Sequence, residues 1–333
     1  MHISLPRITI VTPSFNQGDF IEETICSILD QSYPNLQYII MDGGSQDRTV
    51  EIIKKYERYI SYWESGPDKG QSHAINKGLA RADGGIFNWI NSDDGLLPGA
   101  LQLIGELYLQ KPFDALLTRT SLIRNQTQIG INGATKKGET HIESALEIGL
   151  NQPGHFYRTQ RFKSLNGVDE RYAYVMDLDL WIRFLLTFGQ EGVELTDAIT
   201  TFFRFHSESK SEVEGWGEGS AFEAERISMY HRLARSHSNR NAAIAFRHLY
   251  SQYKLEYEPA ALQSNIPEHQ LAEWINAMLF TPARRAFYAE EFGRAAALSK
   301  GLIPSAMPSQ MRKDALSMRR HAAWKAFLQK IWT

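Results

Sequence analysis

The sequence predicts an α/β protein with a mainly parallel β-sheet, followed by an all-helical region. Over the first hundred residues, short β-branched apolar runs alternate with segments of helical spacing. Such alternation is typical of parallel strands joined by right-handed helical crossovers. Beyond about residue 213, nearly every segment has helical periodicity. We therefore expect an α/β domain over residues 1–212 and a helical region over residues 213–333.

The elements of the first domain follow from its apolar runs. Strands are expected at residues 8–11, 38–41, 60–63, 86–90, 115–118 and 199–205. Helices are expected at residues 20–31, 47–56, 70–82, 158–165 and 177–188, and a glycine-rich loop at residues 130–138. In the helical region, residues 283–299 predict one helix that ends at a glycine cap, Gly301.

The bulk properties exclude several classes of protein. A formal net charge of -2 over 333 residues argues against a general nucleic-acid binder. The single cysteine, Cys26, excludes an internal disulfide framework. No apolar run approaches the roughly 20 residues that a membrane-spanning helix needs, and the N-terminus lacks a signal-peptide pattern. We expect a cytoplasmic protein.

Four polar loops follow the predicted strands, at residues 14–17, 42–45, 66–69 and 91–94. In sheets of this kind, ligands bind beyond the carboxyl ends of the strands. The last of these loops contains two adjacent acids, Asp93 and Asp94, after an apolar strand. Like charges there are costly unless a cation is present, and a divalent cation carrying a phosphate fits oxygen ligands. The alternative is a solvated turn, or the cap of a helix that starts near Pro98.

Two of the other loops carry candidate ligand contacts. Asp42 precedes Gly43 and Gly44, which permit a ligand to approach the backbone; its carboxylate suits a nucleobase or ribose, or else serves the turn itself. Residues 68–71 lead into a helix N-terminus, which favours anions. Lys69 there can contact a phosphate or be merely solvated. Asn76, further along the same helix, is a weaker candidate.

Asp177 is the candidate general base. It begins a predicted helix, two residues before Asp179. Asp179 and Arg183 are spaced as an (i, i+4) ion pair, which gives Asp179 a structural explanation. This leaves Asp177 at the helix start, where its side chain is free to accept a proton.

Taken in order, five motifs resemble the family 2 glycosyltransferases. They are residues 12–16, 42–47, 66–70, 91–94 and 177–183, and the resemblance covers about residues 7–212. It implies the GT-A fold, a nucleotide-sugar-binding α/β domain. It also implies that Asp94 holds Mg²⁺ or Mn²⁺ on the donor diphosphate, that Asp93 lies near the sugar or ribose, and that Asp177 is the base.

The expected donor contacts are Thr12, Pro13, Ser14, Asn16, Asp42, Gly43, Asp68, Lys69, Gln71, Asn76, Ser92 and Asp93. His206, after the last strand, is expected either to complete the metal shell or to be structural. Two departures from the family stand out. Gly43 occupies the position of an acid that contacts uracil, so the base contact falls to Asp42, Asp68 or backbone. Met176 replaces the acid before the base.

The expected function is inverting, metal-dependent sugar transfer from a nucleotide-sugar, expected to be a UDP-sugar, to a carbohydrate or lipid-linked acceptor. Bacterial surface polysaccharide or lipopolysaccharide assembly is the implied setting. The alternatives are a non-catalytic sugar- or nucleotide-binding scaffold and a nicotinamide-dependent oxidoreductase, although the first turn lacks G-x-G-x-x-G.

The last segment, residues 309–333, predicts a basic amphipathic helix with two tryptophans. Such a helix can lie on the inner face of an anionic membrane. It can instead pack on its own domain or on a second subunit in a homodimer.

Overall fold

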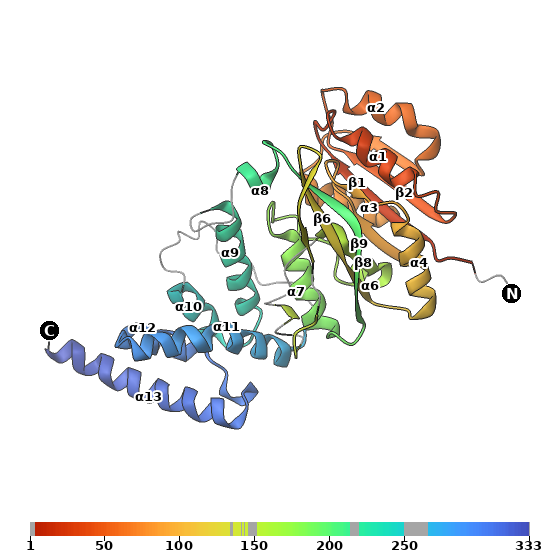
Figure 1. Ribbon diagram of the computed structural model, residues 1–333. Coiled ribbons are helices and arrows are strands. Elements are labelled where there is room, and N and C mark those ends of the chain that lie inside the picture. The colour runs from red at the N-terminus through yellow and green to blue at the C-terminus, as the bar shows by residue number, and fades with distance from the viewer. Residues whose placement is uncertain are drawn as a thin grey trace. The chain divides into compact units, whose positions relative to one another are not determined.

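The computed structural model describes residues 4–133, 136–140, 142, 144–145, 152–213, 220–249 and 266–332. The chain forms two compact units, Met1–Gly215 and Trp216–Thr333 (Figure 1). Gly215, Gly217 and Gly219, just after the predicted boundary at residue 213, lie outside the described residues.

Four parallel strands form the first half of the sheet in unit 1. They are β1 (Ile8–Ser14), β2 (Leu36–Asp42), β3 (Tyr62–Ser65) and β4 (Ile86–Trp89), in the spatial order β3-β2-β1-β4. The register pairs Ser14 with Asp42 and Asp42 with Ser65. Three strands therefore end side by side, which brings their loops to one rim. The predicted mainly parallel sheet is confirmed.

The second half of the sheet is mixed. It contains β8 (His155–Arg158), β6 (Ala115–Arg124), β9 (Val193–Phe205) and the short β5 (Gly95–Leu96), with β7 (Thr127–Asn132) paired to β6. β6 and β9 run parallel, whereas β8 lies antiparallel to both β4 and β6. The loop predicted at 130–138 is wrong at its start, because residues 130–132 pair with β6 as part of β7.

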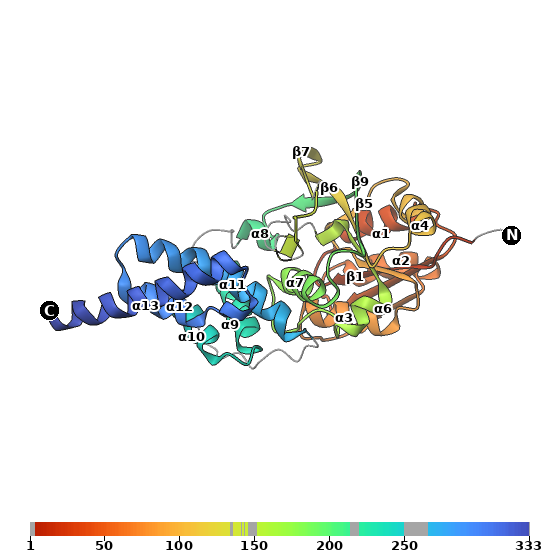
Figure 2. The same ribbon diagram turned by 90° about the horizontal axis from the view of Figure 1, so that it is seen from below.

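Helices cover both faces of this sheet, as Figure 2 shows for α1 and α4 on one face and α3 and α6 on the other. Apolar residues of α1 (Ile21–Leu29), α2 (Thr49–Tyr56) and α4 (Ala100–Gln110) share a core with Ile8 and Ile10 of β1. The other helical elements of unit 1 are η1 (Glu57–Tyr59), α3 (Gln71–Arg81), η2 (Gln152–Gly154), α6 (Thr159–Ser164), α7 (Met176–Phe188) and α8 (Lys210–Val213).

Unit 2 is helical throughout its described part. Its elements are α9 (Ala221–Arg235), α10 (Arg240–Leu249), α11 (Glu268–Tyr288), α12 (Phe292–Gly301), η3 (Pro304–Ala306) and α13 (Ser309–Trp332). No helix among the described residues is both long enough and apolar enough to cross a bilayer.

The prediction of a single helix over residues 283–299 is wrong. The chain ends α11 at Tyr288 and restarts at Phe292, with Glu290 at a φ of 61° between them. Gly301 lies inside α12 and does not cap it. A Cβ at Gly301 would collide with Ala245 of α10, so this glycine permits close helix packing.

Candidate active site

The loop after β4 holds Asp94 in a fully buried position. Asp94 is 0% exposed. Its Oδ1 accepts a hydrogen bond from the Arg204 amide at 3.1 Å, and its Oδ2 accepts one from Asn91 Nδ2 at 3.1 Å. Burial, and next the neighbouring charge of Asp93, raise the pKa of Asp94 well above its usual value. Both oxygens are therefore engaged by protein donors.

Asp93 is the more open acid of the pair. Its side chain is 22% exposed, and its Oδ2 lies 3.0 Å from His206 Nε2. The His206 ring packs on Phe20 at a centroid distance of 4.3 Å. Arg204 Nε donates to the Asp93 carbonyl at 3.0 Å. The sequence grouped His206 with Asp94 as metal ligands, whereas the side-chain contact in the structure joins His206 to Asp93. Ser92, predicted at the donor, is 4% exposed, and its carbonyl accepts from Thr24.

Asp42 organises the loop that follows β2. It is 1% exposed. Its carboxylate accepts hydrogen bonds from the Gly44 and Ser45 amides and from the hydroxyls of Ser45 and Ser65. The turn explanation of Asp42 thus has direct support, while its donor contact stays a prediction.

Gly43 lies beside an exposed aromatic and an acid. A Cβ at residue 43 would stand 3.3 Å from Asp68 Oδ1 and 3.3 Å from Phe15 Cδ2. Phe15 is 59% exposed. Asp68 Oδ1 also accepts from the Gly70 amide at 2.7 Å, which shapes the entry to α3. The sequence analysis did not single out Phe15; an aromatic residue between two polar residues, Ser14 and Asn16, is the signal in the sequence that could have marked it.

The predicted contacts at the end of β1 are partly structural. Thr12 Oγ1 lies 3.2 Å from the Tyr38 hydroxyl in the core. Pro13 lies within β1, opposite Met41 of β2. The Ser14 hydroxyl is buried without a hydrogen-bond partner among the described residues.

Asn16 lies in the loop after β1, with a φ of 52°. Its amide donates to Ser45 Oγ at 2.7 Å, and its Oδ1 accepts from the Gln46 amide at 2.9 Å. Asn16 therefore joins the loops after β1 and β2. A cavity of about 370 Å³ opens beside it, lined by Asn16, Gln17, Asp19, Phe20, Asp47, Arg48 and Glu208.

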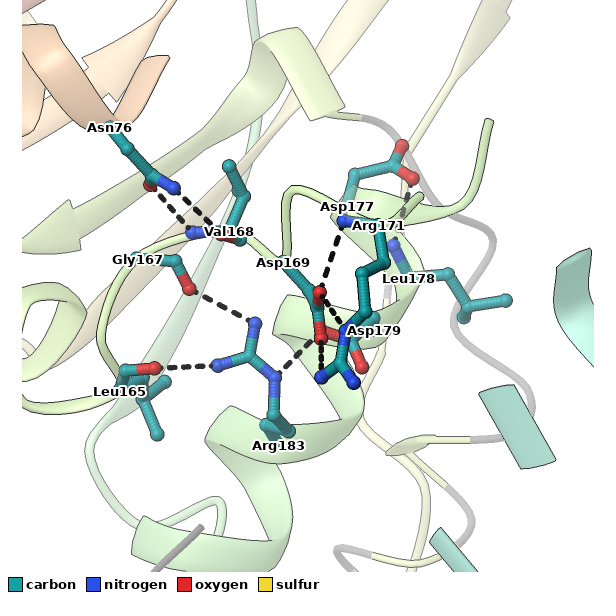
Figure 3. Close-up of polar contacts among 10 residues, drawn as sticks. All are labelled: Asn76, Leu165, Gly167, Val168, Asp169, Arg171, Asp177, Leu178, Asp179 and Arg183. Atoms are coloured by element: carbon teal, nitrogen blue, oxygen red, sulfur yellow. Dashed lines mark hydrogen bonds and ion pairs between the residues drawn. The ribbon is translucent and has the colours of Figure 1, made fainter. Parts of the chain in front are cut away.

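The residues predicted around α3 divide in two. Gln71 Nε2 donates to Asn91 Oδ1 at 2.7 Å. Gln71 therefore reaches the loop of residues 91–94, which contains Asp93 and Asp94 and is called the acid loop below. Lys69 is exposed on the rim. Asn76 faces elsewhere: its amide group bonds the backbone of Val168 in both directions, at 2.9 and 3.0 Å. Asn76 thus anchors a loop, as Figure 3 shows.

Asp177 begins α7 and differs from Asp179 two residues later. Asp179 is 1% exposed and bonds Arg183 Nε at 2.7 Å, which confirms the predicted ion pair. Asp177 is only partly buried, and its one described hydrogen bond is to the Leu178 amide at 2.8 Å. Figure 3 shows the Asp177 carboxyl turned away from Arg183 and its hydrogen-bond partners. Burial raises the pKa of Asp177 to about 6, a value suited to a general base near neutral pH.

Lys210 is a site residue that the sequence did not indicate. Its Nζ donates to Gln71 Oε1 at 2.9 Å and to the Ala173 carbonyl at 2.7 Å. Its charge also acts on Asp177, where it lowers the pKa against the larger effect of burial. A lone lysine after a strand carries no signal of this position in sequence.

This arrangement defines a class of protein: an α/β glycosyltransferase fold with acids on neighbouring loops of one rim. Residues 9–165 match the sequence model of "Glycosyl transferase family 2". Residues 9–165 therefore form a glycosyltransferase family 2 domain, and the expected resemblance is confirmed.

Relatives and solved structures agree. The chain is 39% identical over 94 residues to "Putative teichuronic acid biosynthesis glycosyltransferase TuaG" of Bacillus subtilis. This match covers 27% of this chain and 36% of that protein. The chain is 27% identical over 191 residues to an uncharacterized glycosyltransferase of Rickettsia typhi, covering 54% of this chain and 59% of that protein. Each match thus spans less than two thirds of the relative.

The fold is also that of a solved structure. The crystal structure of S. aureus TarS 1-349 in complex with UDP-GlcNAc is similar with a TM-score of 0.58 and 17% identity, over 95% of this chain and 89% of that one. At this identity the likeness concerns the fold, and it confirms the predicted GT-A architecture.

Proposed function

We propose that the protein transfers a sugar from a UDP-sugar to an acceptor hydroxyl, with inversion at the anomeric carbon. The observation that carries the proposal is the partly buried Asp177, with its pKa near 6, tied through Lys210 and Gln71 to the loop of Asp93 and Asp94. A base and a pair of acids on one rim suit a reaction that deprotonates one oxygen and stabilises another.

Asp177 takes the proton of the acceptor hydroxyl as that oxygen attacks the anomeric carbon. The bond from this carbon to the diphosphate oxygen breaks, and attack from the opposite face inverts the configuration. Asp177 can act only when ionised, so activity requires a pH above its pKa of about 6. Below that pH the rate falls as the carboxylate is protonated.

A divalent cation, Mn²⁺ or Mg²⁺, fits the donor set at Asp93. The open Asp93 carboxylate and the His206 imidazole, 3.0 Å apart, offer oxygen and nitrogen ligands at the rim. No group of three or more His, Cys, Asp or Glu side chains suited to a metal occurs in the described part of the chain. The donor diphosphate would therefore complete the shell. When bound, the cation neutralises charge on the departing diphosphate.

The nucleotide base is best placed at Gly43. Asp68 and Phe15 both approach the space that a side chain at residue 43 would fill. Asp68 can thus accept a hydrogen bond from uracil in place of the missing acid, and Phe15 offers a face for stacking. The similar fold of TarS, whose structure holds UDP-GlcNAc, supports a UDP-sugar as the donor.

The acceptor is proposed to be a growing bacterial surface polysaccharide or its lipid-linked precursor, which the likeness to TuaG supports.

The exposed face of α13 suits a contact with an anionic membrane. The inner face of α13 buries Ala315, Met318 and Ala322. This face packs against the protein itself, as the alternative to a membrane contact predicts. The opposite face exposes Leu316 and Trp324, the latter by 60%.

Unpaired positive charge accompanies these apolar side chains. Among the described residues, no acid forms an ion pair with Lys313, Arg320 or Lys325 of α13. Arg226 and Arg294 of unit 2, by contrast, pair with acids three residues earlier. Lys313, Leu316, Arg320 and Trp324 follow one another at helical spacing and suit lipid headgroups. Cytoplasmic location and a homodimer stay predictions.

Vesicle flotation tests the membrane contact. The Lys313→Glu/Arg320→Glu variant should lose at least about 10-fold in binding to phosphatidylglycerol vesicles, since each cation contributes about 1 kcal/mol. Arg294→Glu is the matched control. Equal binding of wild type to phosphatidylcholine and phosphatidylglycerol vesicles would contradict the contact.

The donor is tested by thermal denaturation with UDP and UDP-GlcNAc, each with and without Mn²⁺. A ligand that binds the folded state raises its apparent stability, so UDP with Mn²⁺ should raise the Tm more than UDP alone. Slow Mn²⁺-dependent hydrolysis of UDP-GlcNAc would establish catalysis. Binding without any turnover would favour the non-catalytic scaffold.

A further inference from the structure

A continuous hydrogen-bond chain links the C-terminal segment of unit 1 to the acid loop. Lys210 donates to Gln71 at 2.9 Å, Gln71 donates to Asn91 at 2.7 Å, and Asn91 donates to Asp94 at 3.1 Å. We call these four residues the Lys210 chain. The donor directions run one way along it, from the ammonium to the buried carboxylate, so every amide in it has one orientation.

The same segment contacts the other acid of the loop. His206, four residues before Lys210, meets Asp93 at 3.0 Å. The turn between them is fixed, because Ser209 is 5% exposed and its hydroxyl and amide both donate to the His206 carbonyl, at 2.8 and 3.0 Å. One short segment thus holds Asp93 directly and Asp94 through two amides.

Lys210 also reaches the region of the candidate base. Its ammonium bonds the Ala173 carbonyl at 2.7 Å, four residues before Asp177, and lies 5.6 Å from the Tyr174 ring centroid. Electrostatic interactions join Asp177 to two titratable groups on neighbouring elements, Lys210 of α8 and Tyr157 of β8. Tyr157 is buried and its pKa is raised, so it is neutral at physiological pH. Lys210 therefore supplies positive charge there.

We propose that Lys210 is a positioning residue with two roles: its charge keeps Asp177 ionised, and its hydrogen bond to Gln71 orients the acid loop for the donor. This deepens the proposed function and rests on it. The two roles are separable, because the charge acts through space whereas the orientation acts through Gln71.

The first experiment follows the ionisation of Asp177 without any substrate. The carboxyl ¹³C signals of aspartate-labelled protein are titrated by NMR, and the Asp177 signal is assigned by its loss in Asp177→Asn. Lys210→Met should move the midpoint upward by about 0.5 pH units, since an exposed charge is screened by solvent. Lys210→Arg keeps the charge and should stay close to wild type.

The second experiment measures UDP binding by calorimetry in the presence of Mn²⁺. Gln71→Leu removes the chain and leaves the charge, so it should weaken UDP about 5-fold with no change in the Asp177 midpoint. Lys210→Met should change both quantities. Lys163→Met is the matched control: Lys163 also donates to a backbone carbonyl, that of Ala82 at 2.7 Å, but lies outside the site.

Identical Asp177 midpoints in wild type and Lys210→Met would overturn the electrostatic role. Unchanged UDP affinity in both Gln71→Leu and Lys210→Met would overturn the orienting role. Failure of the proposed function looks different, because wild type itself would then bind neither UDP nor UDP-GlcNAc, while the titration would still report on Lys210.

Discussion

Two regions of unit 1 each contain a pair of nearby acids, and each pair divides in the same way. Asp94 and Asp179 are buried and hydrogen-bonded to the protein, whereas Asp93 and Asp177 are more accessible. Burial and partners decide which acid is available for chemistry. In α7 the (i, i+4) spacing indicates the partner of Asp179, whereas no spacing indicates the partners of Asp94.

The pairs differ in what neutralises the buried member. Asp179 faces the guanidinium of Arg183, which also donates to the carbonyls of Leu165 and Gly167. Asp94 has only neutral donors at its oxygens, the Asn91 amide and the Arg204 backbone. Asp179 therefore has a cationic partner within the protein, whereas the charges of Asp93 and Asp94 repel each other, and a bound cation can offset that repulsion.

The largest expected effect separates the two acids of α7. Asp177→Asn should reduce sugar transfer by about 10³-fold, because the amide cannot accept the acceptor proton. UDP affinity in Mn²⁺ should stay within about 2-fold of wild type. The decisive measurement is single-turnover transfer over pH 5–8. Wild type should lose activity below pH 6, and wild-type rates in the variant would exclude Asp177 as the base.

The next effect concerns stability. Arg183→Met leaves Asp179 buried without its cation, which should lower the free energy of unfolding by about 3–5 kcal/mol. Arg171→Met is the matched control, because Arg171 pairs with Asp169 while 52% exposed, and such pairs contribute about 0–1 kcal/mol. Figure 3 shows both arginines. Urea denaturation measures the difference, and equal losses would contradict the division between the pairs.

Sequence predicts much of this architecture and less of the site. Four parallel strands and their rim follow from apolar runs such as 38–41, because β-branched and aromatic residues buried on both faces leave a clear local signal. β8 escapes such reasoning, since its pairing with β4 and β6 is non-local. β7 forms a local hairpin with β6, but its largely exposed residues leave no apolar run. Asp177 and the Asp179–Arg183 pair follow from helical spacing. Lys210 and Asn76 do not, because their partners lie more than 30 residues away in sequence.

The third prediction decides between the acids of the loop. The family resemblance assigns the cation to Asp94, whereas exposure and the His206 contact favour Asp93. Asp93→Ala should weaken UDP about 10-fold in Mn²⁺ and little in EDTA, since only the metal-dependent part of binding is lost. Asp94→Asn should have the smaller effect. The reverse order in calorimetry would return the metal to Asp94, and Asp83→Ala, at an exposed surface acid, serves as the control.

The smallest expected effect tests whether the nucleotide base binds beside Gly43, on the same rim as the more accessible acids Asp93 and Asp177. Phe15→Ala and Asp68→Asn should each weaken UDP about 5-fold, which corresponds to about 1 kcal/mol for one stacking or hydrogen-bond contact. Tyr59→Ala is the matched control, because Tyr59 is 56% exposed against 59% for Phe15 but lies in η1. Comparison with ribose 5-phosphate, which lacks the base, sharpens the result. Its affinity should not change in either variant, and a loss there would place Phe15 and Asp68 at the sugar-phosphate part of the donor.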